Sequence, residues 1–207
     1  KVDRPSNLWT RSVYYIGLLA LYDQDPQDRY MAYLDCWGDF HDWSPYRKDF
    51  TTLDADNMCC GQVYCQRYFI DGKDTKYKGI QKVYNNQIAS DRHNTWTWID
   101  AIHMAMPGYA MMTMATGNRK YINFAIKAYT WTRDSCGGTG LYNKEEGLWW
   151  RDRNFVAPYK ESDGKNCYWS RGNGWVFSAL CRTMNYLQPT DKFYAHLLSD
   201  YKAMAKA

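Results

Sequence analysis

Residues 96–109 read WTWIDAIHMAMPGY and open a long apolar run that continues to Met114. Two tryptophans precede the one acidic residue of this stretch, Asp100, and the run behind it predicts a buried helix. An acid at a helix start commonly caps free backbone N–H groups. An acid ringed by tryptophan can instead have its pKa raised by desolvation, as general acid catalysis requires. This stretch alone leaves both interpretations open.

Around this helix, apolar residues recur at three- and four-residue spacing, which predicts an almost wholly helical chain. The predicted helices come in pairs, each an apolar helix, a polar turn with Asp or Asn, and a second helix. The pairs cover residues 13–22 and 29–40, 58–70 and 76–89, 99–116 and 120–133, and 173–187 and 193–207.

Each second helix carries a tyrosine near its start, at positions 30, 77, 121 and 194. Counting back 21 residues from each tyrosine (121 minus 100, for example) reaches an equivalent place near the start of each first helix. These places hold Trp9, Asp56, Asp100 and Asn173. Stacked helical hairpins put equivalent positions along one edge, so we expect a shared rim. The alternative for the two acids is that helix starts favour Asp in any protein.

The stretch 134–168 breaks this period and is rich in glycine. Loops of this length are usually functional or disordered, and aromatic residues such as Trp149 and Trp150 argue against disorder. We therefore expect an ordered loop that folds over the rim.

The composition of the chain limits the classes of partner and ligand that we expect. Lys and Arg number 26 against 22 Asp and Glu, an excess too small to indicate nucleic acid or an anionic membrane as partner. No 18-residue apolar run is present, so no membrane span is expected. Aromatic residues make up 17% of the chain, a surplus typical of surfaces that stack against sugar rings. Nothing in the sequence indicates an oligomeric state.

Seven cysteines cannot all pair, and no Cys-x-x-Cys spacing or His/Asp/Glu cluster indicates a metal site. We expect buried thiols, and neither a metal nor a cofactor. The unpaired cysteine favours the cytoplasm of a bacterium over its periplasm, although the compartment stays open.

Four motifs give the sequence a family resemblance. They are Trp9-Thr-Arg-Ser-Val-Tyr-Tyr-Ile-Gly17, Asp56-Asn-x-x-x-Gly61, Trp98-Ile-Asp100-x-x-x-Met104-Ala-x-Pro107 and Trp169-Ser-Arg171-Gly-Asn173-Gly-Trp175. In this order they resemble the unsaturated rhamnogalacturonyl hydrolases of glycoside hydrolase family 105 and the related unsaturated glucuronyl hydrolases of family 88. The resemblance covers essentially the whole chain.

The resemblance implies an all-α fold, the (α/α)6 barrel, in which six helical hairpins form a ring around a central funnel. Residues 1–207 would be one such barrel domain. Because the sequence predicts about four hairpins, we expect the C-terminal hairpins of the ring to be lacking from this stretch.

The resemblance also implies a reaction, the hydration of a vinyl ether. The substrate is an oligosaccharide, left by a polysaccharide lyase, with a 4,5-unsaturated uronic acid at its non-reducing end. An aspartic acid protonates C4, a water adds at C5, and the hemiketal opens to release the sugar. By motif that acid is Asp100, with Asp56 in the supporting acidic position. The motif form favours unsaturated galacturonic acid on rhamnogalacturonan, a pectin component.

The expected substrate-binding residues surround these acids. Arg171 suits the substrate carboxylate because a guanidinium fork binds carboxylate through two hydrogen bonds. Its alternative is a structural salt bridge, and core packing is the alternative for one of Trp169 and Trp175. Arg151 stands where some family members have histidine. The full expected set is Trp9, Tyr14, Trp98, Arg151, Trp169, Arg171, Asn173 and Trp175.

Asp100 must be protonated near neutral pH, yet a helix N-terminus favours its charged form. We expect burial against Trp96 and Trp98, together with repulsion from Asp56, to outweigh the helix end. His103, one turn further on, is expected to be a packed helix histidine.

Two other classes of function remain as alternatives. One is another helical-toroid carbohydrate enzyme, such as an unsaturated glucuronyl hydrolase, an ordinary glycosidase or a lyase. The other is a helical-repeat scaffold for protein partners, which would not be expected to gather Trp and Asp at equivalent helix starts.

Overall fold

The computed structural model describes residues 6–207 and contains each of the predicted helices within one or a few residues of its expected ends. The first helices of the pairs are α1 (Trp9–Gln24), α3 (Ala55–Met58) with α4 (Cys60–Asp71), α6 (Asp100–Thr116) and α8 (Ser170–Met184). The second helices are α2 (Asp28–Phe40), α5 (Thr75–Ser90), α7 (Lys120–Asp134) and α9 (Lys192–Met204). The second pair differs from the prediction, because its first helix is interrupted at Cys59.

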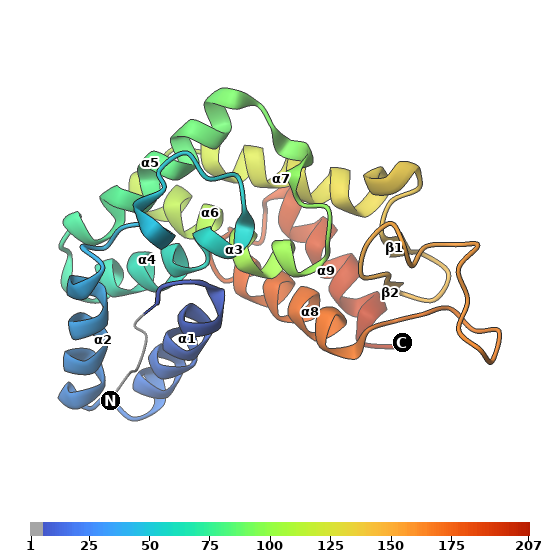
Figure 1. Ribbon diagram of the computed structural model, residues 1–207. Coiled ribbons are helices and arrows are strands. Elements are labelled where there is room, and N and C mark those ends of the chain that lie inside the picture. Colours follow the sequence, from blue (N-terminus) through green and yellow to red (C-terminus); the bar gives the residue numbers. More distant parts are fainter. Residues whose placement is uncertain (1–5) are drawn as a thin grey trace.

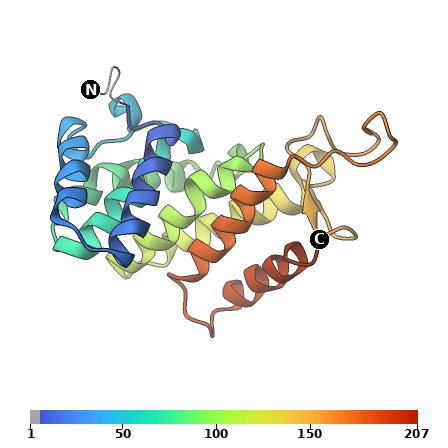
Figure 2. The ribbon, with the colours of Figure 1, turned by 90° about the horizontal axis from the view of Figure 1, so that it is seen from below.

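The hairpins stand side by side in an arc (Figure 1). The first helices pack in chain order, α1 on α4, α4 on α6 and α6 on α8, and each contacts its own second helix. Seen from below, α9 lies along the outer side of α8, and α1 and α2 lie at the opposite end of the arc (Figure 2). The predicted all-α architecture of stacked helical hairpins is confirmed.

Helix α6 lies at the centre of this arc, and its residues from Ala101 to Met112 are all buried. It contacts α3, α4, α7 and α8, which explains why its sequence is apolar on every face. Pro107 lacks an N–H, so the carbonyl of His103 has no partner within the helix. The side chain of Gln62 on α4 donates to that carbonyl at 2.7 Å, and Arg182 on α8 donates to Gln62 at 3.1 Å. These two bonds join three first helices.

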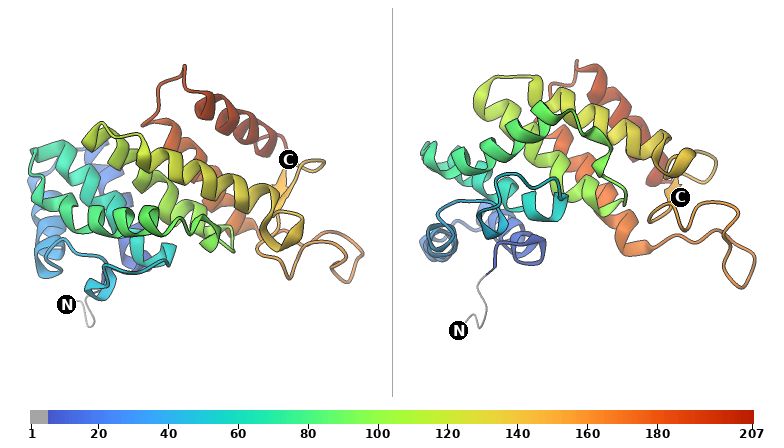
Figure 3. Two further views of the ribbon diagram at one scale, coloured as in Figure 1. Left: turned by 90° about the horizontal axis from the view of Figure 1, so that it is seen from above. Right: turned by 45° about the horizontal axis from the view of Figure 1, so that its top comes forward.

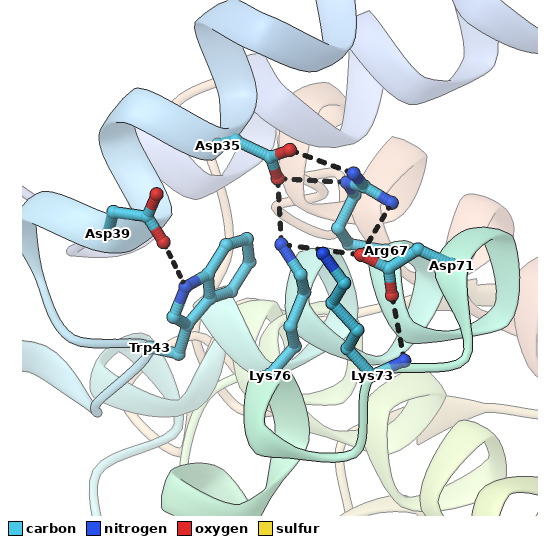
Figure 4. Close-up of polar contacts among 7 residues, drawn as sticks. All are labelled: Asp35, Asp39, Trp43, Arg67, Asp71, Lys73 and Lys76. Carbon is cyan, nitrogen blue, oxygen red and sulfur yellow. Dashed lines mark hydrogen bonds and ion pairs between the residues drawn. The ribbon is translucent and has the colours of Figure 1, made fainter.

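A group of ion pairs joins α2, α4 and α5 (Figure 4). Arg67 donates two hydrogen bonds to Asp35, at 2.9 and 2.8 Å, and pairs with Asp71 at 3.0 Å. Lys76 donates to Asp35 at 2.9 Å and lies over the ring of Trp43. Burial raises the pKa of Asp35, but the bonds from Arg67 and Lys76 outweigh it and hold the pKa below its usual value.

A second paired carboxylate fastens α9 to α7. Asp200 is buried, accepts two hydrogen bonds from Arg133 at 2.8 Å, and accepts another from the hydroxyl of Tyr129 at 2.6 Å. A buried charge with this many donors is compensated within the protein.

The stretch between α7 and α8 is ordered where it meets the helices. It holds the short helix η3 (Cys136–Gly138) and an antiparallel hairpin of β1 (Tyr142–Asn143) and β2 (Leu148–Trp149). Both views in Figure 3 show residues near 160 extending away from the helices. The short helices η1 (Tyr46–Lys48) and η2 (His93–Thr95) lie in other connections.

The cysteine prediction holds for most of the thiols. Within residues 6–207 every cysteine is unpaired; Cys59, Cys60, Cys65 and Cys136 are buried, Cys167 is partly buried, and Cys36 and Cys181 are exposed. Across the same residues, no helix is long and apolar enough to cross a membrane.

Candidate active site

The predicted rim exists. Helices α1, α3, α6 and α8 begin at Trp9, Ala55, Asp100 and Ser170, so the four equivalent positions all lie in or within the first residues of these helices. The first and last of the helices meet at the rim, because the rings of Trp9 and Trp175 lie edge to face with centroids 6.4 Å apart. The starts of α3 and α6 lie near the centre of the molecule (Figure 1).

Asp100 is the first residue of α6 and is partly buried. The cap position is Ile99, so the cap interpretation does not explain Asp100. Its Oδ2 atom is buried and has no hydrogen-bond partner among residues 6–207. Burial raises the pKa of the carboxyl above its usual value, although the backbone N–H of Asp100 and the charges of Arg151 and Arg171 act against it.

Asp56 lies in α3, close enough to Asp100 for the two charges to interact. The cap of α3 is Asp54, whose side chain accepts the Asp56 backbone N–H at 2.9 Å. Burial, then the negative charges of Asp54 and Asp100, raise the pKa of Asp56 to about 6. Repulsion from Asp56 is expected to raise the pKa of Asp100, but burial raises it, and the charge of Asp100 instead raises the pKa of Asp56.

Two arginines converge next to Asp100 from different segments. Arg171 lies over the ring of Trp169 with its guanidinium carbon 4.4 Å from the ring centroid, and the guanidinium of Arg151 lies 5.8 Å from the same centroid. Together with Phe155 and Cys167 they line a hollow of about 380 Å³, which we call the Trp169 hollow. Arg171 has no ion pair with a carboxylate in the described part of the chain, so the structural salt bridge is not found.

Arg151 reaches this place because its loop is bound to the start of α6. Trp98 and Asp152 form an antiparallel bridge, and the N–H of Ile99 donates to the carbonyl of Arg151 at 3.0 Å. The prediction that the loop folds over the rim is confirmed for this segment. Periodicity could not have found Phe155, because the loop has no repeat from which to place it.

Asn173 holds the same loop from the other side. Its amide donates to the carbonyl of Trp149 and its oxygen accepts the Trp149 N–H, both at 2.9 Å, and the amide also donates to the carbonyl of Trp169. These bonds engage both ends of the buried amide with backbone. A Cβ at Gly172 would lie 2.5 Å from the Trp169 ring, so glycine lets that ring lie directly against the backbone of α8.

The remaining predicted residues lie in several places. Trp175 packs against His103, with ring centroids 4.7 Å apart. Burial and the charge of Arg182 lower the pKa of His103 to about 4, so its ring is neutral at neutral pH, as expected for a packed histidine. Tyr14 is not brought to the acids, because its ring packs edge-on against Tyr15 and Tyr33 between α1 and α2. Trp98 lines a different hollow from Arg171.

No group of three or more His, Cys, Asp or Glu side chains with metal-binding geometry exists within residues 6–207. Arg151 and Arg171 line the Trp169 hollow with the indole ring, and their charges reach Asp100, which in turn interacts with Asp56. An anion-binding pair therefore lies near a carboxyl group that could donate a proton.

The chain is similar to known proteins, and three examples show the range of identity. An unsaturated 3S-rhamnoglycuronyl hydrolase from Formosa agariphila is 29% identical over 214 residues, which cover 93% of this chain and 55% of that protein. The structure of a family 88 glycosyl hydrolase from Bacteroides vulgatus matches with a TM-score of 0.88 and 26% identity, over 96% of this chain and 60% of its own. The structure of a family 105 glycoside hydrolase from C. acetobutylicum matches with a TM-score of 0.75 and 17% identity. That match covers 99% of this chain and 61% of the other.

These matches reverse the order of the two families named from the motifs. The motifs placed family 105 first and family 88 second, but the family 105 structure is similar at an identity that shows the fold alone. The chain spans little more than half the length of the Formosa agariphila protein. The model that matches residues 2–207 is Glycosyl Hydrolase Family 88, and the chain belongs to that family.

Proposed function

We propose that the rim site removes a 4,5-unsaturated uronic acid from the non-reducing end of a lyase-generated oligosaccharide by hydrating its vinyl ether. The observation that carries this proposal is the state of Asp100. It is a partly buried carboxyl with raised pKa and an unpartnered Oδ2, near two arginines. Arg171 has no ion pair within residues 6–207, and Arg151 pairs with Asp152 at 3.4 Å. An acid poised to give a proton next to a carboxylate-binding pair suits an unsaturated uronate.

The substrate carboxylate binds in the Trp169 hollow in this proposal. Arg171 and Arg151 approach one indole ring from two segments, and their guanidinium donors can hold both carboxylate oxygens. Because Arg171 covers the Trp169 ring itself, that ring orients the guanidinium in addition to bordering the sugar. The uronate ring then lies between the arginines and Asp100.

The chemical step needs one proton donor and one water. The protonated carboxyl of Asp100 gives its proton to C4, the C4=C5 double bond is lost, and positive charge develops at C5 and the ring oxygen. A water attacks C5 and gives a proton back to the Asp100 carboxylate, which restores the acid. The resulting hemiketal at C5 opens to a ketone and leaves the former ring oxygen as a hydroxyl on C1. The hemiacetal at C1 then collapses to an aldehyde, and the next sugar leaves as an alcohol that takes up the hydroxyl proton.

Binding of the substrate favours the reactive form of Asp100. In the free protein the positive charges of Arg151 and Arg171 lower the pKa of Asp100 against the effect of burial. A bound carboxylate offsets those charges, so the pKa of Asp100 rises further when the substrate is in place. Asp56 has a pKa of about 6, so it is protonated and uncharged at mildly acidic pH. At higher pH it is ionised, and its negative charge repels an ionised Asp100.

The sugar that follows the unsaturated uronate is rhamnose in this proposal. The motif form favours a rhamnogalacturonan oligosaccharide, with galacturonic acid as the source of the unsaturated residue. The similar protein from Formosa agariphila is named for a rhamnoglycuronyl group, which favours a second candidate that shares the rhamnose. The Trp169 hollow binds the carboxylate common to both.

The test is the ultraviolet absorbance of the conjugated double bond. Adding the protein to lyase-generated rhamnogalacturonan or rhamnoglycuronan oligosaccharides should abolish that absorbance while an equimolar amount of shorter sugar appears. A saturated oligosaccharide of the same length should stay intact. Cleavage of the saturated sugar would show an ordinary glycosidase, and a rise in absorbance on intact polysaccharide would show a lyase; either result contradicts the proposal.

A further inference from the structure

A second hollow lies beside the Trp169 hollow and is larger, about 600 Å³. Its walls include the indole rings of Trp98 and Trp131, the amides of Asn94 and Asn154, and the side chains of Asp152 and Arg153. We call it the Trp131 hollow. Its volume is in the range of small-molecule sites, and most of its polar lining residues are exposed.

The two hollows share a wall. The Trp98–Asp152 bridge and the bond from Ile99 N–H to Arg151 carbonyl make this segment a short extended pair. Successive side chains of an extended segment point to opposite faces, so Arg151 lines the Trp169 hollow and Asp152 lines the Trp131 hollow. The chain turns directly after Asp152, where the Phe155 N–H donates to the Asp152 carbonyl, and this turn brings Arg153 to the Trp131 hollow as well.

The charges of the Trp131 hollow favour an anionic ligand. The carboxylate of Asp152 is engaged, because it accepts the Asn154 N–H at 2.8 Å and lies 3.4 Å from Arg151. Arg153 is exposed and forms no ion pair with any residue from 6 to 207. The hollow therefore presents one uncompensated guanidinium beside two indole rings and two amides, the side chains that bind acidic sugars.

Hydrogen bonding and close backbone packing fix the segments that carry Trp131 and Arg153. The hydroxyl of Thr132, next to Trp131, donates to the carbonyl of Trp96 at 2.8 Å. A Cβ at Gly137, whose φ is 69°, would lie 2.6 Å from the Cβ of Arg153. Glycine there lets η3 pack directly against the Arg153 backbone and fixes where its side chain starts.

We propose that the Trp131 hollow is a second saccharide site. It binds the next uronate of the substrate chain, which follows the unsaturated uronate and the sugar attached to it. The proposal rests on the proposed function for the identity of the oligosaccharide. The unsaturated end enters the Trp169 hollow, the chain passes over the Trp98–Asp152 wall, and Arg153 binds the next uronate carboxylate. A disaccharide is too short to reach it.

The experiment compares an unsaturated disaccharide with an unsaturated tetrasaccharide from the same lyase digest. Arg153→Ala should lower kcat/KM on the tetrasaccharide about tenfold, the effect of losing one charged hydrogen bond, and leave the disaccharide unchanged. Asn94→Ala should show a smaller loss with the same length dependence. Arg29→Ala, which removes an exposed arginine on α2, serves as the matched control and should alter neither substrate.

A binding measurement keeps this proposal separate from the proposed function. A saturated tetrasaccharide of alternating uronate and rhamnose, titrated by calorimetry, should bind the unaltered protein and bind Arg153→Ala about tenfold more weakly. If neither unsaturated substrate is hydrolysed, the proposed function fails and this titration alone decides on the hollow. Equal losses on both lengths, or full binding of the saturated sugar by Arg153→Ala, would overturn the second site.

Discussion

The rim and the ion-pair group between α2, α4 and α5 are built from the same kinds of residue, yet their charges are in opposite states. Asp35 receives donors from Arg67 and Lys76, and its pKa is lowered. Neither Asp100 nor Asp56 accepts a hydrogen bond from a side chain within residues 6–207, and their pKa values are raised. Figure 4 shows the paired group, in which nitrogen faces every carboxylate.

This difference separates a structural role from a chemical one. A buried carboxylate with complete pairing holds helices together and has no proton to give. A carboxyl that is desolvated but unpaired costs stability, and such groups cluster at functional sites. The comparison therefore assigns stability to Asp35 and Arg67 and chemistry to Asp100.

The largest expected effect is on catalysis. Asp100→Asn keeps the size of the side chain but removes the acid, so kcat should fall about 10³-fold on the unsaturated disaccharide. The midpoint of thermal unfolding should not fall, because Oδ2 has no partner to lose and the Asn oxygen can still accept the backbone N–H of residue 100. Asp42→Asn, which alters an exposed acid, is the control and should keep full activity. Near-full activity of Asp100→Asn would remove this residue from the mechanism.

The reverse pattern is expected in the paired group. Arg67→Ala leaves Asp35 and Asp71 without their main donor and should lower the free energy of unfolding by about 2–4 kcal/mol. The kcat of the folded variant should stay unchanged, because these residues lie between α2, α4 and α5. Urea unfolding and steady-state kinetics measure the two quantities. Lys78→Ala, which removes an exposed pair with Asp74, should change neither.

A smaller effect is expected from shortening the guanidinium fork of the Trp169 hollow. Arg171→Lys keeps the charge but loses the planar pair of donors and the stacking on Trp169, so KM should rise about tenfold with kcat nearly unchanged. Arg119→Lys, at an exposed arginine before α7, controls for the substitution itself. Unchanged kinetics would mean that Arg171 does not bind the substrate carboxylate.

The helices and the rim could be predicted because both follow from local rules. Three- and four-residue spacing locates helices such as α6, and a constant offset from a tyrosine locates their starts. The offset could not show which of two neighbouring acids caps the helix. Asp54, two residues before Asp56, is the residue that caps α3. Tyr14 fell within a motif, but its position on α1 points its ring towards α2, a direction that motif matching does not reveal.

The smallest effect concerns stability and pH at Asp56. Its pKa is raised from 3.8 to about 6, so the folded protein binds more protons than the unfolded chain between these values and loses stability as the pH rises through them. A shift of about two units corresponds to ~3 kcal/mol, and partial exposure reduces this to about 1 kcal/mol. Asp56→Asn abolishes that loss.

The stability of Asp56→Asn relative to the unaltered protein should therefore increase by about 1 kcal/mol between pH 4 and pH 7, measured by urea unfolding at several pH values. Asp42→Asn provides the contrast, because Lys48 lowers the pKa of Asp42 and its titration falls below this window. Its relative stability should stay flat from pH 4 to pH 7. A flat difference for Asp56→Asn as well would mean that neither burial nor the charges of Asp54 and Asp100 raise the pKa of Asp56. The rim would then lose one of the two acids that distinguish it from the paired group around Asp35.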